Sequence, residues 1–182
     1  MRYSSKMIIA ISAMFSSAVM ANHHEESRHA DAHIHGAGHL NFAVEGKEIH
    51  LELEIPGFDI LGFESVTTDT QRELIHDAIH DLKEGDLWKF SSAAGCKLVS
   101  ASANLAGEED HGENHHNHDH ELTHMDFGAT YVYECEKPGK LKVMSTNLFT
   151  RFENSETLKV QSFTDTGQTA AIMTRAQPEV RF

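Results

Sequence analysis

Histidine is concentrated in two short tracts of this chain, and imidazole is the common nitrogen ligand of zinc, copper, nickel and iron. Each tract contains six of the 15 histidines. The second tract is internal, irregular and mixed with acidic residues, unlike the unbroken terminal run of a purification tag. A merely solvating loop is the other alternative, but imidazole and carboxylate groups together favour metal binding. The first tract comprises His23, His24, His29, His33, His35 and His39, and the second comprises His111, His115, His116, His118, His120 and His124.

The end of the first tract has the spacing of a defined metal site. His33 and His35 are two residues apart, so on an extended segment their side chains point to the same side. Histidines from other segments would complete a preorganised metal site. The alternative is a polar N-terminal segment that binds no metal. The candidate ligands of this site are His33, His35, His39, His76, His80 and His124.

The second tract is expected to be an auxiliary metal-binding loop. The segment 106–121 contains no large apolar residue, so it cannot contribute to a core and is expected to be disordered without metal. Because a flexible segment loses conformational entropy when it binds, its affinity for each ion should be lower than that of the preorganised site. The auxiliary ligands are His111, His115, His116, His118 and His120.

A second arrangement of possible ligands lies on a predicted helix. His76 and His80 are four residues apart, so their rings lie side by side on one helix face and can hold one ion. The alternative is two exposed histidines among acidic neighbours. Asp77 between them occupies the position of the general base in zinc peptidases, but aspartate is shorter than glutamate and no third ligand follows at a characteristic spacing. A zinc-dependent hydrolase using these three residues is therefore a weak alternative.

The two cysteines, Cys96 and Cys135, are expected to form a disulfide if the chain is exported. The bridge would close the base of a hairpin whose tip is the second histidine tract. By the loop-closure estimate it would contribute about 3 to 4 kcal/mol. The alternative is a zinc site made by two thiolates and imidazoles, which requires reduced cysteines.

The elements that must position these residues follow from hydrophobic periodicity. Two alternating segments joined by Gly46-Lys47 predict a β-hairpin, and Thr70 and Glu73 form a possible capping box before a helical stripe. The stripe contains Leu74, Ile75, Ala78, Ile79 and Leu82. Residues 57–64 are too rich in glycine for a regular element. The remaining predicted strands are 96–104, 126–135, 141–149, 158–163 and 168–173. Together these predict an α+β fold with a mostly antiparallel sheet of about six strands and one main helix at about 69–83.

The N-terminus has the features of a cleavable secretory signal. Residues 1–21 combine basic Arg2 and Lys6 with an apolar run of about fourteen residues, which is short for a membrane anchor. Cleavage would leave 22–182 as one domain, with flexible residues 22–32 and the histidine-rich loop 107–123. The whole chain has a formal charge of −13, and losing two basic residues would make it −15. Nucleic acid is not expected as a partner, because the sequence contains no basic stripe that would neutralise phosphates.

The order of several short motifs resembles that of the periplasmic zinc-binding ZrgA family. The motifs are His33-Ile34-His35-Gly36, Pro56-Gly57-Phe58-Asp59-Ile60-Leu61-Gly62-Phe63-Glu64, Ala94-Gly95-Cys96, the acidic histidine-rich insert, His124-Met125-Asp126-Phe127, Tyr133-Glu134-Cys135 and Leu148-Phe149. The resemblance implies zinc capture in the periplasm of a Gram-negative bacterium and delivery to an ABC-type uptake system. By position it supports His33, His35 and His124, whereas Ser65 stands where the family often has histidine.

We therefore expect an exported, non-enzymatic Zn²⁺-binding protein, monomeric or homodimeric, whose partners are components of an ABC-type zinc transporter. After signal cleavage it would not be an integral membrane protein. A copper or nickel chaperone or metal buffer is the alternative, because divalent copper is favoured at nitrogen sites. The three methionines of the mature chain, Met125, Met144 and Met173, are scattered rather than clustered, which does not favour copper.

Overall fold

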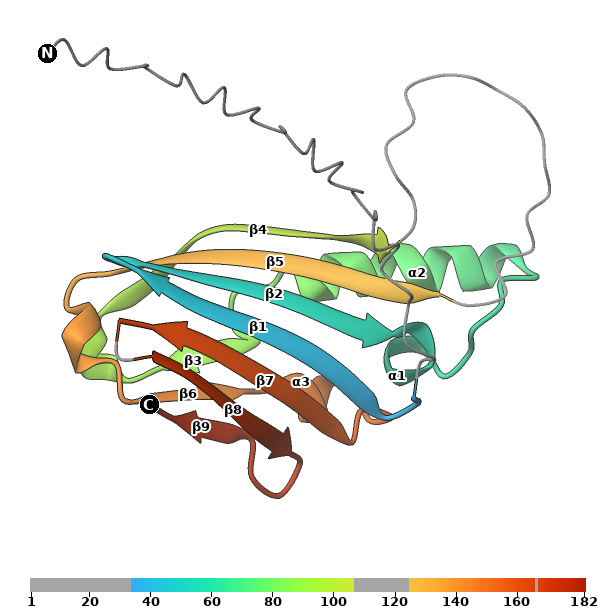
Figure 1. Ribbon diagram of the computed structural model, residues 1–182. Coiled ribbons are helices and arrows are strands. Elements are labelled where there is room, and N and C mark those ends of the chain that lie inside the picture. Colours follow the sequence, from blue (N-terminus) through green and yellow to red (C-terminus); the bar gives the residue numbers. More distant parts are fainter. Residues whose placement is uncertain (1–33, 107–124, 166) are drawn as a thin grey trace, which may run out of the picture. The chain divides into compact units, whose positions relative to one another are not determined.

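In the computed structural model, residues 34–106, 125–165 and 167–182 are described, and they form two β-sheets with short helices (Figure 1). The larger sheet has six strands in the order β4-β5-β2-β1-β7-β8, and the smaller has three in the order β3-β6-β9. The six strands are β4 (Cys96–Ala106), β5 (Asp126–Cys135), β2 (Glu48–Pro56), β1 (Ala37–Glu45), β7 (Thr157–Thr164) and β8 (Gly167–Thr174). The smaller sheet contains β3 (Trp88–Phe90), β6 (Val143–Thr146) and β9 (Glu179–Arg181). The helices are α1 (Gly57–Leu61), α2 (Asp69–Leu82) and α3 (Leu148–Arg151), with 3-10 turns η1 (Ser92–Ala94) and η2 (Pro138–Lys140).

The large sheet is mixed, because β1 pairs with β2 antiparallel and with β7 parallel. Its other pairs, β2 with β5, β4 with β5 and β7 with β8, are antiparallel. The predicted hairpin is confirmed: Glu45 pairs with Glu48 across Gly46-Lys47, and Gly46 has the positive φ of 62° that such a turn requires. The α+β class agrees with this combination of sheets and short helices.

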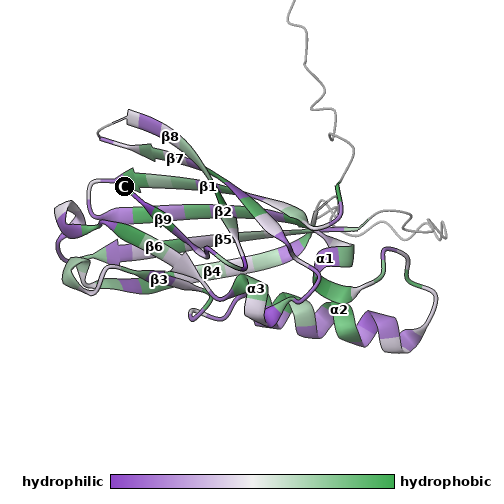
Figure 2. Ribbon diagram, turned by 90° about the horizontal axis from the view of Figure 1, so that it is seen from below, coloured by the Kyte–Doolittle hydropathy of each residue, from purple (hydrophilic) through white to green (hydrophobic). Residues whose placement is uncertain are grey.

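One face of the large sheet is apolar and packs against the small sheet, α2 and α3. Along β2, Ile49, Leu51 and Leu53 are buried while Glu52 and Glu54 are exposed, as the strand period of two requires. Figure 2 shows this alternation as successive green and purple bands along the strands. Side chains from both sheets and from α2 and α3 form a single hydrophobic cluster. The hydroxyl of Tyr131 on β5 donates to the carbonyl of Leu82 at 2.5 Å and ties the end of α2 to the large sheet.

Four local expectations are wrong. The capping box of α2 uses Thr68 and Gln71 instead of Thr70 and Glu73, because Thr68 is the last extended residue and its hydroxyl accepts the Gln71 N–H. Leu74 is 45% exposed rather than buried, since it lies beside the stripe that meets the sheet. Residues 57–61 form the helix α1 despite Gly57, and the predicted strand 141–149 divides into β6 and α3.

The disulfide between Cys96 and Cys135 is confirmed, and it excludes the thiolate zinc site because neither sulfur remains free. Cys96 pairs with Cys135 at one end of the β4–β5 ladder, and Ala106 pairs with Asp126 at the other end. The loop predicted at 107–123 therefore connects the strand ends farthest from the bridge. Its histidines lie outside the described residues.

The buried tyrosines predict a loss of stability at high pH. Burial raises the pKa of Tyr133 to about 12 and that of Tyr131 further still. Because the pKa of a buried tyrosine is higher in the folded than in the unfolded state, its protonated hydroxyl stabilises the fold fully at pH values below the unfolded pKa near 10. This contribution to the free energy of unfolding is lost as the pH rises toward 12. The urea midpoint should therefore fall between pH 10 and 12, and Tyr133→Phe should fall less steeply than the wild type. Parallel slopes for the two proteins would contradict this assignment.

Candidate metal centre

Three segments of the chain meet at one end of the large sheet, around the short helix α1 (Figure 1). The Gly57 N–H at the start of α1 donates to the Met125 carbonyl at 2.6 Å. The Gly36 N–H donates to Asp59 Oδ1 of α1 at 2.7 Å. Thus the residue that follows His35 and the residue that follows His124 are both bonded to α1.

His35 lies at this junction, in the turn that leads into β1. Its ring stacks on Phe58 of α1, with 4.6 Å between centroids and an interplanar angle of 15°. Its Nε2 is in contact with Glu64 Oε1. The His35 side chain is 51% exposed, so metal can reach this imidazole–carboxylate pair from solvent. Imidazole nitrogen and carboxylate oxygen are both ordinary zinc ligands.

The turn after His35 is fixed by hydrogen bonds to two other segments, α1 and the start of β7. Gly36 has φ of 80°, and a Cβ there would approach the Glu156 side chain to 3.1 Å, so the position requires glycine. The Gly36 carbonyl accepts from the backbone N–H of Glu156 at 3.1 Å and from that of Thr157 at 2.7 Å. The orientation of the turn that carries His35 is therefore determined by β7 as well as by α1.

Asp59 is the buried charged group of this region. Its side chain is 0% exposed, and among the described residues its Oδ2 has no hydrogen-bond partner. Burial raises the pKa of Asp59, and the Gly36 N–H and His35 offset this only in part. The carboxylates of Glu156 and Asp126 raise the pKa further. Among the described residues, this end of the sheet thus combines the His35 imidazole with several acids, a composition that attracts cations.

The predicted ligands are distributed unequally over the structure. His35 is at the junction described above, whereas His33 and His124 lie outside the described residues, each one residue from a described segment. His39 is exposed on β1, opposite Glu54 on β2 and Lys159 on β7. The five auxiliary histidines lie outside the described residues as well.

His76 and His80 are exposed on α2, one turn apart. In the described part of the chain, three donor atoms within 4.8 Å of one another occur at His80, Asp81 and Glu84, a group that does not include His76. Glu84 Oε2 accepts from both terminal nitrogens of Arg151, at 2.8 and 2.9 Å. A cation at this group would have to compete with that guanidinium.

Sequence reasoning missed Asp59 and Glu64 as possible parts of the site. A usable signal was present: Asp59 is a charged residue inside the apolar run Phe58-Asp59-Ile60-Leu61, and buried carboxylates are rarely tolerated without a function or a partner. Glu64 carries no comparable signal, since its proximity to His35 depends on how residues 57–64 fold back.

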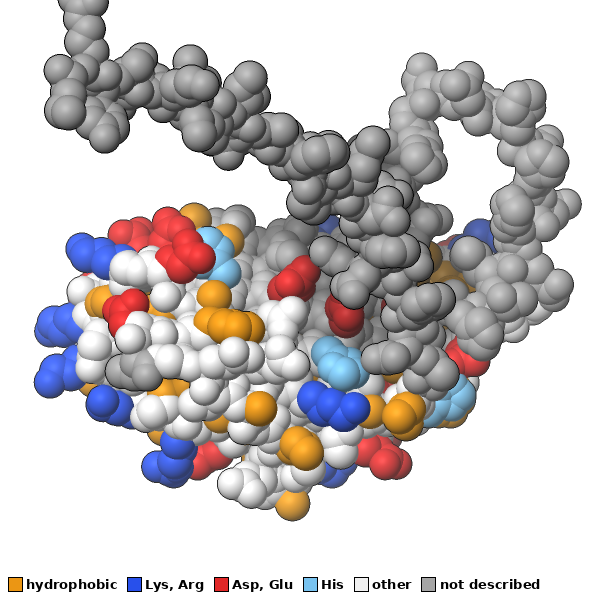
Figure 3. Space-filling model, viewed as in Figure 1, with side chains coloured by type: hydrophobic (Ala, Val, Ile, Leu, Met, Phe, Trp, Pro, Cys, Tyr) orange, Lys and Arg blue, Asp and Glu red, His pale blue; other side chains and the backbone are white. Residues whose placement is uncertain are grey.

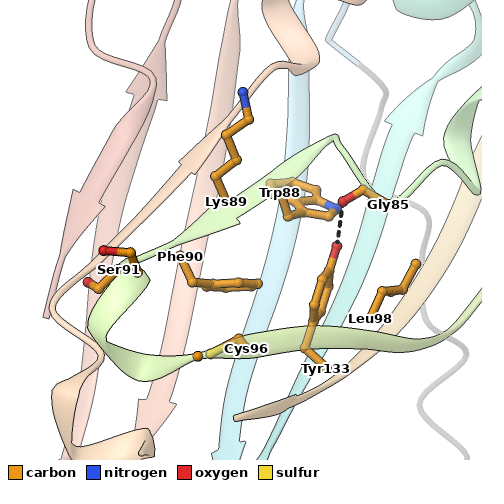
Figure 4. A pocket seen from close by; sticks show the side chains of 10 residues that line it. Gly85, Trp88, Lys89, Phe90, Ser91, Cys96, Leu98 and Tyr133 are labelled. Carbon is orange, nitrogen blue, oxygen red and sulfur yellow. Dashed lines mark hydrogen bonds between the residues drawn. The ribbon is translucent and has the colours of Figure 1, made fainter. Parts of the chain in front are cut away.

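A cavity of about 320 Å³ lies elsewhere, between β3 and the start of β4 (Figure 4). Phe90 and Tyr133 meet edge to face in its wall, and the Tyr133 hydroxyl donates to the Gly85 carbonyl at 3.4 Å. Its lining contains no histidine, aspartate or glutamate, so it is not suited to zinc. Figure 3 shows lysine and arginine side chains in blue along the left margin, at the end of the large sheet where β1 is joined to β2 in Figure 1.

The fold and this junction define a two-sheet α+β domain with an imidazole–carboxylate pair at one end of its larger sheet. Residues 32–182 match the model of the family described as ZrgA family zinc uptake protein. The chain belongs to this family, which confirms the resemblance seen in the motif order. No curated protein matches the chain significantly. Within the described residues, none of the helices is long and apolar enough to cross a membrane.

Proposed function

We propose that this protein captures Zn²⁺ in the periplasm of a Gram-negative bacterium and delivers it, without catalysis, to an ABC-type uptake system. The observation that carries the proposal is the convergence on α1 of Gly36, which follows His35, and Met125, which follows His124. Family membership supports zinc as the cargo. Export through a signal at residues 1–21 is part of this proposal.

The proposed high-affinity site uses His35 with His33 and His124, and Glu64 as a carboxylate neighbour of His35. Three neutral imidazoles with water or a carboxylate form the usual tetrahedral zinc shell. His39, His76 and His80 are candidates for further ions, and the loop 107–123 would collect ions more weakly. Because protons compete for the imidazole lone pairs, zinc affinity should fall at acidic pH.

Zinc competition with a chromophoric chelator tests this site. His35→Ala should weaken the tightest site at least about tenfold, since it removes a ligand and not only an outer-shell partner. His76→Ala is the matched control, an exposed helical histidine whose loss should leave the tight site unchanged. Deletion of residues 108–121 should lower the number of bound ions and spare the tight site. If the deletion abolishes tight binding, the loop is itself the high-affinity site and this ranking is wrong.

The delivery step needs a separate test in cells. Deleting the gene in the bacterium that encodes it should reduce zinc accumulation under zinc limitation, and the wild-type protein should restore it better than His35→Ala. Copper and nickel contents should remain unchanged. A loss of copper or nickel instead of zinc would assign a different cargo.

Mass spectrometry of the periplasmic protein should find Asn22 at its N-terminus.

A further inference from the structure

Asp59 is buried without a complete set of partners, although it lies in direct contact with the turn that carries His35. Its Oδ1 accepts the Gly36 N–H at 2.7 Å. Its Oδ2 has less than 1 Å² of accessible surface and no hydrogen-bond partner among the described residues. Buried polar groups are nearly always satisfied, so an exception requires a physical reason.

The geometry points to Asp59 as a positioning residue of the zinc centre, an inference that rests on the proposed function. Oδ1 holds the His35 turn against α1, and Oδ2 is an acceptor that gains its donor only when zinc and its ligands are in place. Metal-binding histidines commonly need a carboxylate on the side of the ring away from the metal, since it orients the ring and raises its basicity.

The surroundings of Asp59 support this role over a purely structural one. A carboxylate that served only to hold Gly36 would need one oxygen, and the carbonyl of an asparagine side chain would serve equally well. Burying a second, unpartnered oxygen is unfavourable in the metal-free protein. His35 stacks on Phe58, the residue that precedes Asp59 in α1.

Asp59→Asn separates the two roles because it retains the shape and the acceptor for Gly36 while replacing Oδ2 with an amide nitrogen. We expect zinc affinity, measured by chelator competition, to fall about 10- to 100-fold. The urea midpoint of the zinc-free protein should stay unchanged or rise, since a buried carboxylate is removed. If Asp59 had only a structural role, its replacement would change the zinc affinity and the urea midpoint together.

Two matched variants complete the experiment. Glu156→Gln removes the same charge from an exposed carboxylate near Asp59, and Thr157→Val removes the hydroxyl that donates to the Gly36 carbonyl at 3.1 Å. Glu156→Gln should weaken zinc binding clearly less than Asp59→Asn does, because the charge of an exposed carboxylate is screened by solvent. Thr157→Val should lower the midpoint without a comparable loss of affinity.

The outcomes are distinguishable. If the wild type fails to bind zinc tightly, the proposed function is overturned and this inference with it. If the wild type binds tightly and Asp59→Asn binds within twofold of it, only the inference is overturned. It is also overturned if Glu156→Gln weakens binding equally, which would indicate general electrostatics, or if Asp59→Asn and Thr157→Val lower the midpoint and affinity in parallel.

Discussion

Replacing both Cys96 and Cys135 with alanine should lower the free energy of unfolding by about 4 kcal/mol. The bridge spans a sequence separation of 39 residues, and opening it releases a long loop in the unfolded chain, which gains conformational entropy. The loss is large relative to the total stability of an ordinary domain, about 5 to 15 kcal/mol. Urea unfolding of the wild type and the double variant measures it directly.

The same variant should retain zinc affinity as long as it is folded. The bridge lies at the Cys96/Cys135 end of the β4–β5 ladder, and the Gly57–Met125 hydrogen bond lies beyond the opposite end. Reduced wild type is the control, because it should unfold near the midpoint of the double variant, while reductant should not affect the variant. A difference below about 1 kcal/mol would mean that the unfolded chain stays compact in this region.

Substitution of Gly57 by valine should destabilise the domain by about 2 to 3 kcal/mol through overpacking. A Cβ at this position would lie 2.7 Å from the Met125 carbonyl oxygen and 2.9 Å from the Met125 Cβ. Both atoms belong to the residue that begins the described segment before β5, so the clash cannot be relieved by rotation of a flexible side-chain end. Either α1 or the chain at Met125 must move.

Because Gly57 joins α1 to the residue after His124, we also expect Gly57→Val to weaken the proposed zinc site. Gly139→Val is the matched control, since nothing lies within 4 Å of a Cβ there. Urea midpoints and chelator competition should show both losses for Gly57→Val and neither for Gly139→Val. Unchanged zinc affinity in a destabilised Gly57→Val would separate α1 from the metal site and contradict the proposed convergence.

Local patterns were sufficient where neighbouring residues supply the interactions. The β1–β2 hairpin was predictable because its alternation and its Gly46-Lys47 turn lie within about twenty residues. The helix α2 was predictable because its apolar spacing from Leu74 to Leu82 extends over more than two turns, although its cap was misplaced by two residues. The pairing of Cys96 with Cys135 followed from there being only two cysteines.

Other elements depend on contacts between distant segments. The strands β3, β6 and β9 have three or four residues each, too few for a periodic signal, and they are strands because they pair with one another. The parallel pairing of β1 with β7 joins residues more than one hundred positions apart. The helix α1 forms at a glycine that is held by the Met125 carbonyl.

The sequence by itself determined the chemical character of this protein: its two histidine tracts, its acidic charge, its disulfide and the motif order of its family. Those properties reside in residue types and spacing, which exist before folding. Only the tertiary structure decided that His35 meets Glu64 and Phe58, and that Asp59 is buried beneath Gly36. These contacts join segments separated by 23 to 29 residues, so they depend on how α1 and the residues after it pack against the turn before β1, and not on local preference.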